Sequence, residues 1–574
     1  MRTLTIFFAI GLTAMSSAHA GGVVNLCGAD DEGGAGLNLA HALEGGGVVQ
    51  FYCPPGTVIA MHRLHTLGQA ILIDGGDNVT LDAGGASAMF STVGDSVPIG
   101  FRHIVLRNGR VGPGPIVTNS LIQGEADLTL DSVQINSSET PILARSVTIS
   151  DSKFIGNTGT VITTFIAVIK GSEFSNNDGP PLQQPQLRPG PWSRATIEGT
   201  HFNGNGPVYW DGTSEITGGT SFVNNGRGAT KGGALWIAGD ATVEKTEFIN
   251  NTAMSGGAIW LEIGSLHVRR GTFRGNRASE NGGAIAIAPA SPWGGNASIR
   301  LTYSTFRQNT ARDGGAIHLG RHADPAADLV GDAVTFGGNG ADQSGGAIYA
   351  AHGSVKFSRA LFVANRANDE GGAIFSGPMP EDKVRLGNAL IVRNAAQSGG
   401  GFRASMIELV NSTVADNNGG GFSMRPLSGL APEASGELKL KNTIVVNNQT
   451  GNCGAIPDRM SFMDAGNNIQ HPGTDCGPTL PSTDPALDSF YVPLTGSPAR
   501  FAGDNDTCVQ DELVHALDIY SYARPEGSRC TIGAVEGDLE RHALRALRRP
   551  RDQPLAEPLR RLLDGLGIRR YQSP

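Results

Sequence analysis

The chain has 574 residues and 81 glycines, so that about 14% of it is glycine, roughly twice the ordinary share. Hydrophobic residues make up 39% and charged residues 17%, which excludes collagen and favours a folded chain over a disordered one. The formal net charge of -9 argues against a general nucleic-acid-binding protein.

The first twenty residues have the pattern of a secretory signal peptide. Arg2 supplies the positive start, an apolar run from Leu4 to Ala14 follows, and Ala18-His19-Ala20 has the small-x-small pattern of a cleavage site. The apolar run is too short to span a bilayer, and no other stretch approaches about 18 apolar residues. We therefore expect residues 1–20 to be a signal peptide, and an exported chain, extracellular, periplasmic or outer-surface associated, without a transmembrane segment.

The cysteines cluster at the two ends of the exported chain. There are six, and none lies between residues 54 and 452. Six cysteines allow fifteen connectivities, but this long gap favours local pairs. A zinc site would need closely spaced cysteines, which are absent, and we expect no metal or cofactor. The expected disulfides are Cys27–Cys53, Cys453–Cys476 and Cys508–Cys530.

Two short signals alternate along the middle of the chain. One is Phe-x-x-Asn, with Phe at 154, 174, 202, 222, 248, 273, 306, 336 and 362, and with degenerate copies at Ile391–Asn394, Val414–Asn417 and Ile444–Asn447. The other is Gly-Gly-Ala-Ile or a close variant, beginning at residues 232, 256, 282, 314, 345, 371 and 399. The spacing of 24 to 32 residues is too short for WD40 or kelch blades, and the leucine pattern of leucine-rich repeats is missing. Short alternating segments between the signals predict strands, and one coil of a parallel β-helix fits this period.

Each signal has a structural role in such a coil. We expect Phe to point inward and stack on the Phe of the next coil. We expect Asn to follow the strand, tolerate a left-handed backbone and form a hydrogen-bonded ladder. The glycine pair allows a turn with positive φ. These residues are interpreted as scaffold.

The alternation of Phe-x-x-Asn with Gly-Gly-Ala-Ile over about residues 150–450 resembles the repeats of chlamydial polymorphic outer-membrane proteins and related right-handed parallel β-helix proteins. Cys27 together with residues 37–43, 48–51 and 71–75 resembles a degenerate CSLREA-type N-terminal region. The region from Cys453 to Glu536, with Ser497-Pro498-Ala499, resembles a choice-of-anchor Q C-terminal region. The resemblance implies an all-β, right-handed parallel β-helix with end caps, in a secreted or cell-envelope protein.

We divide the exported chain into four parts. Residues 21–70 are expected to form an N-terminal cap, 71–450 the β-helix, 451–537 a Cys-rich C-terminal region, and 538–574 a basic tail that can be helical. For the tail we consider contact with an anionic envelope surface, docking on the acidic β-helix, and a solvated segment.

The residue after each Gly-Gly-Ala-Ile should point outward, because successive side chains of a strand alternate between its two faces. Trp210 is expected to fall in line with this row. Read down the coils, the position holds Trp236, Trp260, Ala286, His318, Tyr349, Phe375 and Arg403. An exposed aromatic row suits sugar rings or a protein partner, whereas stacking between coils or cover by an insert is the structural interpretation.

An enzyme is the rival hypothesis, because carboxylates in register would suit a polysaccharide lyase or glycoside hydrolase of the pectate-lyase-like type. The acids nearest to this requirement, with the histidines beside them, are Asp313, His318, His322, Asp324 and Asp328, together with Glu262 beside the row. Their spacing is irregular, and we assign no catalytic residue. The leading hypothesis is a non-catalytic adhesive or surface-associated rod that contacts a polysaccharide or cell-surface glycan. A purely structural stalk is the third possibility.

Overall fold

The computed structural model describes residues 21–85, 88–94, 96–110, 121–183, 193–288, 297–320, 327–427, 436–454 and 460–537. The expected signal peptide and the basic tail lie outside this part of the chain. The chain divides into two compact units, Met1–His201 and Phe202–Pro574. Both are built from short parallel strands that pair one coil apart, which confirms the right-handed parallel β-helix.

The first unit winds through three sheets, which we name A, B and C. Sheet A contains β1 (Gly22–Val24), β2 (Gly47–Phe51), β5 (Ile71–Asp74), β8 (Pro98–Arg102), β11 (Asp127–Asp131), β14 (Ser146–Ser150), β17 (Ile166–Lys170) and β19 (Arg194–Glu198). Sheet B contains β3 (Thr57–Ala60), β6 (Val79–Asp82), β9 (Val105–Arg107), β12 (Gln134–Asn136), β15 (Lys153–Ile155) and β18 (Glu173–Ser175). Sheet C contains β4 (His65–Leu67), β7 (Phe90–Thr92), β10 (Ile122–Gln123), β13 (Ile142–Leu143) and β16 (Ile162–Thr163). The strand β20 (His201–Asn203) lies where the two units meet in sequence.

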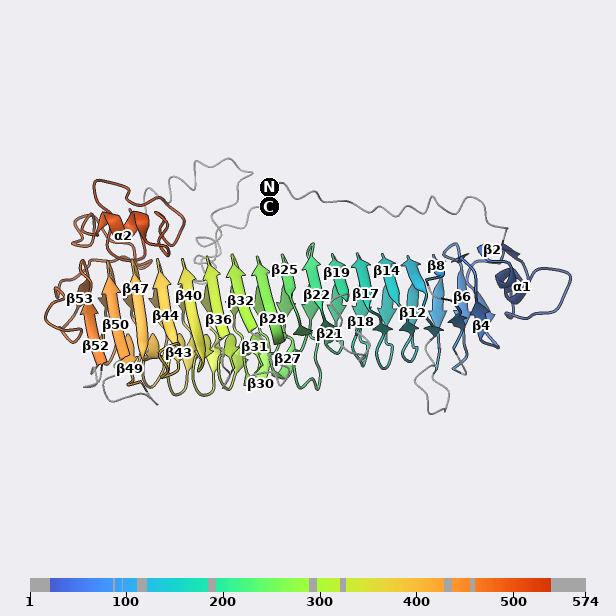
Figure 1. Cartoon of the computed structure of the whole chain (residues 1–574), viewed down its shortest axis with the longest axis horizontal. Coiled ribbons are helices and arrows are strands. Elements are labelled where there is room, and N and C mark those ends of the chain that lie inside the picture. The colour runs from blue at the N-terminus through green and yellow to red at the C-terminus, as the bar shows by residue number, and fades with distance from the viewer. Residues whose placement is uncertain are drawn as a thin grey trace. The chain divides into compact units, whose positions relative to one another are not determined.

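The second unit has the corresponding sheets A, B and C and a short sheet D. Its sheet A strands stand side by side in chain order (Figure 1): β22 (Thr213–Thr217), β25 (Ala241–Glu244), β28 (Ile259–Arg269), β32 (Ala297–Thr302), β36 (Ala327–Asp332), β40 (Gly353–Ser358), β44 (Lys383–Gly387), β47 (Met406–Val410), β50 (Gly436–Lys441) and β52 (Met460–Asp464). Sheet B contains β23 (Ser221–Val223), β26 (Glu247–Ile249), β29 (Thr272–Arg274), β33 (Thr305–Arg307), β37 (Thr335–Gly337), β41 (Leu361–Val363), β45 (Leu390–Val392), β48 (Thr413–Ala415), β51 (Ile444–Val446) and β53 (Ile469–His471). Sheet D contains β27 (Thr252–Ser255), β30 (Arg277–Asn281), β34 (Thr310–Ala311), β38 (Gly340–Ala341) and β42 (Arg366–Ala367). Sheet C contains β21 (Val208–Asp211), β24 (Leu235–Ala238), the start of β28, β31 (Ile285–Ile287), β35 (Ile317–Leu319), β39 (Ile348–Ala350), β43 (Ile374–Ser376), β46 (Phe402–Ala404) and β49 (Phe422–Met424).

The phenylalanines of the repeat stack on one another inside the β-helix, as predicted. In the second unit the rings of residues 202, 222, 248, 273, 306, 336 and 362 form one column with centroid separations of 4.6 to 5.1 Å. In the first unit Phe154 lies on Phe174 at 4.5 Å. Because every ring is at most 1% exposed, this column is the centre of the hydrophobic core.

The asparagines form the predicted ladder. Asn251 donates from Nδ2 to Oδ1 of Asn276 at 2.9 Å and to the carbonyl of Phe222 at 3.0 Å, and the pattern recurs along the second unit. The left-handed backbone lies one residue earlier than expected, at Asn250 with φ of 55°, because the ladder residue itself must aim its amide inward. In the last degenerate repeat the ladder residue is Asn448, and the assignment to Asn447 was off by one.

The two glycines of the pair have different roles. Gly256 has φ of 64°, as predicted for the turn, and a Cβ there would lie 2.3 Å from the carbonyl oxygen of Ile259. At Gly257 a Cβ would lie 2.2 Å from the carbonyl oxygen of Gly283, which belongs to the next coil. The second glycine therefore allows adjacent coils to approach closely.

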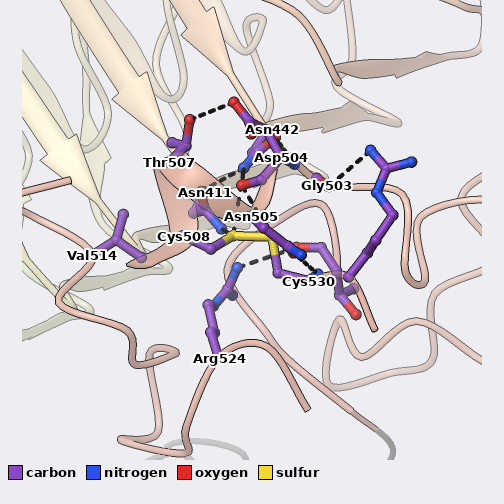
Figure 2. Close-up of a disulfide and its surroundings, with 12 residues drawn as sticks. Asn411, Asn442, Gly503, Asp504, Asn505, Thr507, Cys508, Val514, Arg524 and Cys530 are labelled. Carbon is purple, nitrogen blue, oxygen red and sulfur yellow. Dashed lines mark hydrogen bonds between the residues drawn. A yellow bond between two sulfur atoms is a disulfide. The ribbon is translucent and has the colours of Figure 1, made fainter. Parts of the chain in front are cut away.

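The three disulfides pair as predicted, Cys27–Cys53, Cys453–Cys476 and Cys508–Cys530. The first joins residues on either side of α1 (Leu39–Glu44) in the sequence, and the N-cap of this helix is Asn38. The third joins the start of the C-terminal segment 504–537, including α2 (Asn505–Gln510), to its later part. Figure 2 shows this bridge against the β-helix, where Asn411 donates from Nδ2 to Sγ of Cys508 at 2.9 Å.

The C-terminal segment packs on the coils of the second unit. Asn442 donates from Nδ2 to the carbonyl of Asp504 at 3.2 Å, and Ser358 donates from Oγ to the carbonyl of Leu513 at 2.7 Å. Tyr520 and Val535 lie in a core cluster with Ile444. Within the described residues, no helix is both long enough and apolar enough to cross a membrane.

Candidate binding surface

One row on sheet C of the second unit carries most of the residues singled out from the sequence. Strand pairing places its members at the same position of successive coils, and the row runs Tyr209, Trp236, Trp260, Ala286, His318, Tyr349, Phe375 and Arg403. The inward neighbours on each strand, such as Ile259 and Leu261, are fully buried in the core. We refer to this set as the aromatic row.

The placement of Trp210 in this row was wrong. Trp210 pairs with the inward Ile237, is 2% exposed, and donates from Nε1 to the carbonyl of Thr213 at 3.1 Å. Tyr209 takes the place in the row. Because β21 is not preceded by a Gly-Gly-Ala-Ile motif, its register could not be counted from the sequence, and alternation puts every second side chain inside.

Tyr209 and Trp236 are the more open aromatic members of the row, and the buried Trp260 follows them. Tyr209 and Trp236 are half-buried, with ring centroids 6.0 Å apart and a tilt of 54°. Trp260 is 6% exposed and donates from Nε1 to Oε2 of Glu262 at 2.7 Å. Lys231 places Nζ 3.2 Å from the same carboxylate oxygen and 4.8 Å from the Trp260 ring centroid. The Trp260 ring, against which Trp236 packs, therefore borders a pair of opposite charges.

Burial raises the pKa of two polar groups on β21, the Tyr209 hydroxyl and the Asp211 carboxyl, above their usual values. Tyr209 consequently stays neutral at physiological pH and keeps a hydroxyl that can both donate and accept a hydrogen bond. Sequence reasoning missed Tyr209 and Lys231. The signal that could have found Tyr209 is the alternation of Val208 and Trp210, which are both inward apolar residues.

The C-terminal part of the row is closed by its own members. His318 stacks on Tyr349 with centroids 4.9 Å apart, and Tyr349 stacks on Phe375 at 4.7 Å. These three side chains are 3%, 8% and 7% exposed. The guanidinium of Arg425 lies 5.5 Å from the Phe375 ring centroid. In this part of the row the side chains of successive coils therefore stack on one another.

The two acids of the considered cluster that the structure describes, Asp313 and Asp328, have separate hydrogen-bond partners. Asp313 is buried, and its Oδ2 lies 3.2 Å from Nε of Arg312. Its Oδ1 accepts a hydrogen bond from the backbone N–H of Ser344. Asp328 belongs to β36 on sheet A and accepts a hydrogen bond from the hydroxyl of Ser354. His322 and Asp324 lie outside the described residues.

One group of side chains among the described residues has donor atoms close enough for a metal ion. Carboxylate oxygens of Asp30 and Asp31 and a ring nitrogen of His62 lie within 4.8 Å of one another. Asp30 is buried and already bonded to Nε2 of His65 at 2.6 Å and to the backbone N–H of His62 at 3.0 Å. These hydrogen bonds account for the buried carboxylate as part of the N-terminal fold.

Comparison with known families agrees with this architecture. The family model described as right-handed β-helix region matches residues 131–328, and that of the Chlamydia polymorphic membrane protein repeat matches residues 333–351. No curated protein and no solved structure gives a significant match. The fold and these matches define a right-handed parallel β-helix repeat protein. Residues 333–351 are similar to the polymorphic-membrane-protein repeat, and the disulfides suit an oxidising compartment.

Proposed function

We propose that this protein is an exported, non-catalytic, surface-associated β-helix that contacts a glycan through the open end of its aromatic row. The observation that carries the proposal is the pair of half-buried rings of Tyr209 and Trp236 on successive coils, followed on the next coil by the buried Trp260 with Lys231 and Glu262 beside it. Large partly exposed rings next to fixed polar groups are the usual composition of a small-molecule binding surface.

The chemistry of these residues suits a sugar chain. An aromatic face packs against the apolar C–H face of a pyranose ring, while a carboxylate accepts and an ammonium donates hydrogen bonds to hydroxyl groups. Successive coils are about 4.8 Å apart, which is close to the length of one sugar unit along a chain. Neighbouring rings on the row can therefore meet neighbouring sugars of one polysaccharide.

A binding role is favoured over hydrolysis or elimination by the state of the nearest acid. Glu262 accepts a hydrogen bond from Trp260 and lies in an ion pair with Lys231, so its carboxylate is already engaged. Glycosidases use two carboxyl groups about 5 to 10 Å apart on either side of the scissile bond. The purely structural stalk draws its support from the closed part of the row at His318, Tyr349 and Phe375.

The test uses the exported chain, residues 21–574, on a panel of neutral and acidic polysaccharides in affinity electrophoresis. We compare it with the double variant Tyr209→Ala/Trp236→Ala and with Tyr52→Ala, in which a tyrosine that is 83% exposed elsewhere is removed. Reducing ends and unsaturated products are measured in the same samples.

We expect retention on at least one polysaccharide, a loss of about tenfold in affinity in the double variant, and none in Tyr52→Ala. A tenfold change corresponds to about 1.4 kcal/mol, which is within the range of one aromatic contact. Equal retention of the double variant, retention on no polysaccharide, or release of new reducing ends would each overturn the proposal.

A further inference from the structure

The outward side of sheet B changes character along the second unit. In its three-residue strands the middle side chain points into the core, so the first and third point outward. In β26, β29 and β33 the outward positions include charged or hydroxyl residues: Glu247, Thr272, Arg274, Thr305 and Arg307. In β41, β45 and β51 every outward position is apolar: Leu361, Val363, Leu390, Val392, Ile444 and Val446. A parallel sheet that is apolar on both faces needs a cover on each of them.

The chain that follows the last coil supplies this cover. One hydrophobic cluster joins the outward residues of β41, β45 and β51 to apolar residues from further along the chain: Tyr491, Val492, Ile519, Ile532 and Val535. As a result, five of the six outward residues are at most 5% exposed. The second unit therefore has a second hydrophobic core, which lies outside its coils and is shared between sheet B and the C-terminal part of the chain.

The C-terminal segment, residues 504–537, holds the coils at two places. At the first, residues 511–514 lie against sheet A, where Ser358 donates from Oγ to the carbonyl of Leu513 at 2.7 Å. Glycine at position 387 makes this approach possible, because a Cβ on Gly387 would lie 2.4 Å from Cβ of Leu513. We call residues 511–514 the first arm.

Charge adds to the hold of the first arm. An oxygen of the Glu512 carboxylate lies 2.9 Å from Nζ of Lys356 on β40, and the same carboxylate is paired with Arg385 on β44. Asn388, which follows β44, donates from Nδ2 to the carbonyl of Val514 at 3.0 Å. The first arm is therefore bonded to two consecutive coils.

The second place of contact is formed by residues 531–535, which we call the second arm. The backbone N–H of Ala534 donates to Oγ1 of Thr413 at 3.0 Å, and that of Gly533 donates to the carbonyl of Asn442 at 2.8 Å. Ile532 and Val535, on either side of these hydrogen bonds, belong to the outer hydrophobic core.

The disulfide Cys508–Cys530 ties the two arms together. Cys508 lies shortly before the first arm, and Cys530 directly precedes the second. Both cysteines are 0% exposed, and Figure 2 shows the bridge beside Asn411 and Asn442, which follow β47 and β50. With the bridge closed, docking of one arm keeps the other at a high effective concentration beside its own site. With the bridge broken, the arms are joined only through the intervening chain.

We propose that the C-terminal segment is a redox-controlled clasp of the last coils, and that reduction of Cys508–Cys530 releases it and uncovers the apolar outward side of sheet B. A dithiol reductant supplies two electrons and two protons: the S–S bond breaks, both cysteines become thiols, and the reductant becomes a disulfide. Because both sulfurs are buried, the clasp opens before a reductant reaches them. It closes only where an oxidising compartment allows the bridge to form. The inference concerns sheets A and B and does not depend on the aromatic row on sheet C.

The test uses residues 21–574 and compares the unmodified protein with Cys508→Ser/Cys530→Ser. The matched control is Cys27→Ser/Cys53→Ser, which removes a bridge of similar sequence separation, 26 against 22 residues, from the first unit. Amide hydrogen exchange read by mass spectrometry follows the C-terminal segment and, separately, the coils from β40 to β51. Fluorescence of 8-anilinonaphthalene-1-sulfonate reports exposed apolar surface.

In Cys508→Ser/Cys530→Ser we expect the amides of the second arm to exchange about tenfold faster and the dye fluorescence to rise, while the coils from β40 to β51 keep their protection. The control should leave the exchange of the C-terminal segment unchanged. Dithiothreitol added to the unmodified protein should reproduce the faster exchange of the second arm.

Glu512→Gln gives a reading that leaves the bridge in place. Because opening precedes reduction, a weaker first arm should speed the reduction of Cys508–Cys530 by dithiothreitol about threefold, as measured by alkylation and mass mapping. Glu381→Gln removes one exposed negative charge from the same unit and should leave this rate unchanged. The reduction rate of Cys27–Cys53 should be the same in both variants.

Unchanged exchange of the second arm in Cys508→Ser/Cys530→Ser would overturn the inference. An equal loss of protection in the coils from β40 to β51 would also overturn it, because the C-terminal segment would then not open separately from the coils. Where the double variant does not fold, Glu512→Gln decides: a reduction rate of Cys508–Cys530 no greater than in Glu381→Gln excludes the clasp.

Discussion

The asparagine ladder gives the most exacting test of the fold, and Asn276→Ala is the change to make. Oδ1 of Asn276 accepts hydrogen bonds from the backbone N–H and from Nδ2 of Asn251, at 3.0 and 2.9 Å. Nδ2 donates to the carbonyl of Phe248 and to Oδ1 of Asn309, both at 2.9 Å. Alanine removes all four bonds in a position that is 0% exposed.

The magnitude follows from the groups left without partners. Two N–H groups of Asn251 lose their acceptor and the Phe248 carbonyl loses a donor. A buried unsatisfied polar group costs about 1 to 3 kcal/mol. For these three groups the free energy of unfolding should therefore fall by about 3 to 9 kcal/mol. The control is Asn203→Ala, because Asn203 is exposed and its Oδ1 accepts one exposed hydrogen bond of 3.3 Å from Asn224. We expect a change below about 0.5 kcal/mol there.

The assay is urea denaturation followed by tryptophan fluorescence, since Trp260 lies in the same coil as Asn251. Amide hydrogen exchange of residues 245–280 supplies a local reading. A loss below about 1 kcal/mol in Asn276→Ala, with the amide of Asn251 as protected as before, would refute the ladder as a source of stability.

Two further predictions concern the core and one buried acid. Phe248→Ala should lower the free energy of unfolding by about 3 to 5 kcal/mol, because the ring is stacked on both Phe222 and Phe273; a loss under about 1 kcal/mol in the same urea assay would contradict the inward assignment. Burial raises the pKa of Asp382 to about 6, against backbone N–H donors from Gly353 and Met379. The folded state then binds more protons than the unfolded state between the usual pKa and 6, so stability should rise by about 2 kcal/mol as the pH is lowered from 7.5 to 4.5. Asp382→Asn should remove this rise, and urea midpoints that change equally with pH in both proteins would contradict it.

Much of the fold can be predicted from residues that have the same local role in every repeat. Phe248 and Phe273 occupy equivalent places in each repeat, so one correct strand register fixes all of them. The glycine pair at Gly256 marks a turn that only a residue with free positive φ adopts without strain. The cysteines are predictable because short sequence separations leave few alternatives among near neighbours.

Prediction from the sequence fails where the repeat is interrupted, and where the exposure of a side chain depends on the neighbouring coil. Trp210 was placed outward because no glycine pair precedes its strand, and a shift of one residue exchanges the two faces. A one-residue error of the same kind led to the prediction of Asn447 as the ladder residue, which is Asn448 in the structure.

The sequence by itself determined the coil, its period and the inward columns of Phe and Asn, because these depend on alternation within one strand and on local backbone geometry. Only the tertiary structure decided which outward side chains remain available. His318, Tyr349 and Phe375 cover one another, whereas Tyr209 and Trp236 stay half open. The physical reason is that exposure is a property of neighbouring coils, whose side chains are far away in sequence but one strand apart in space.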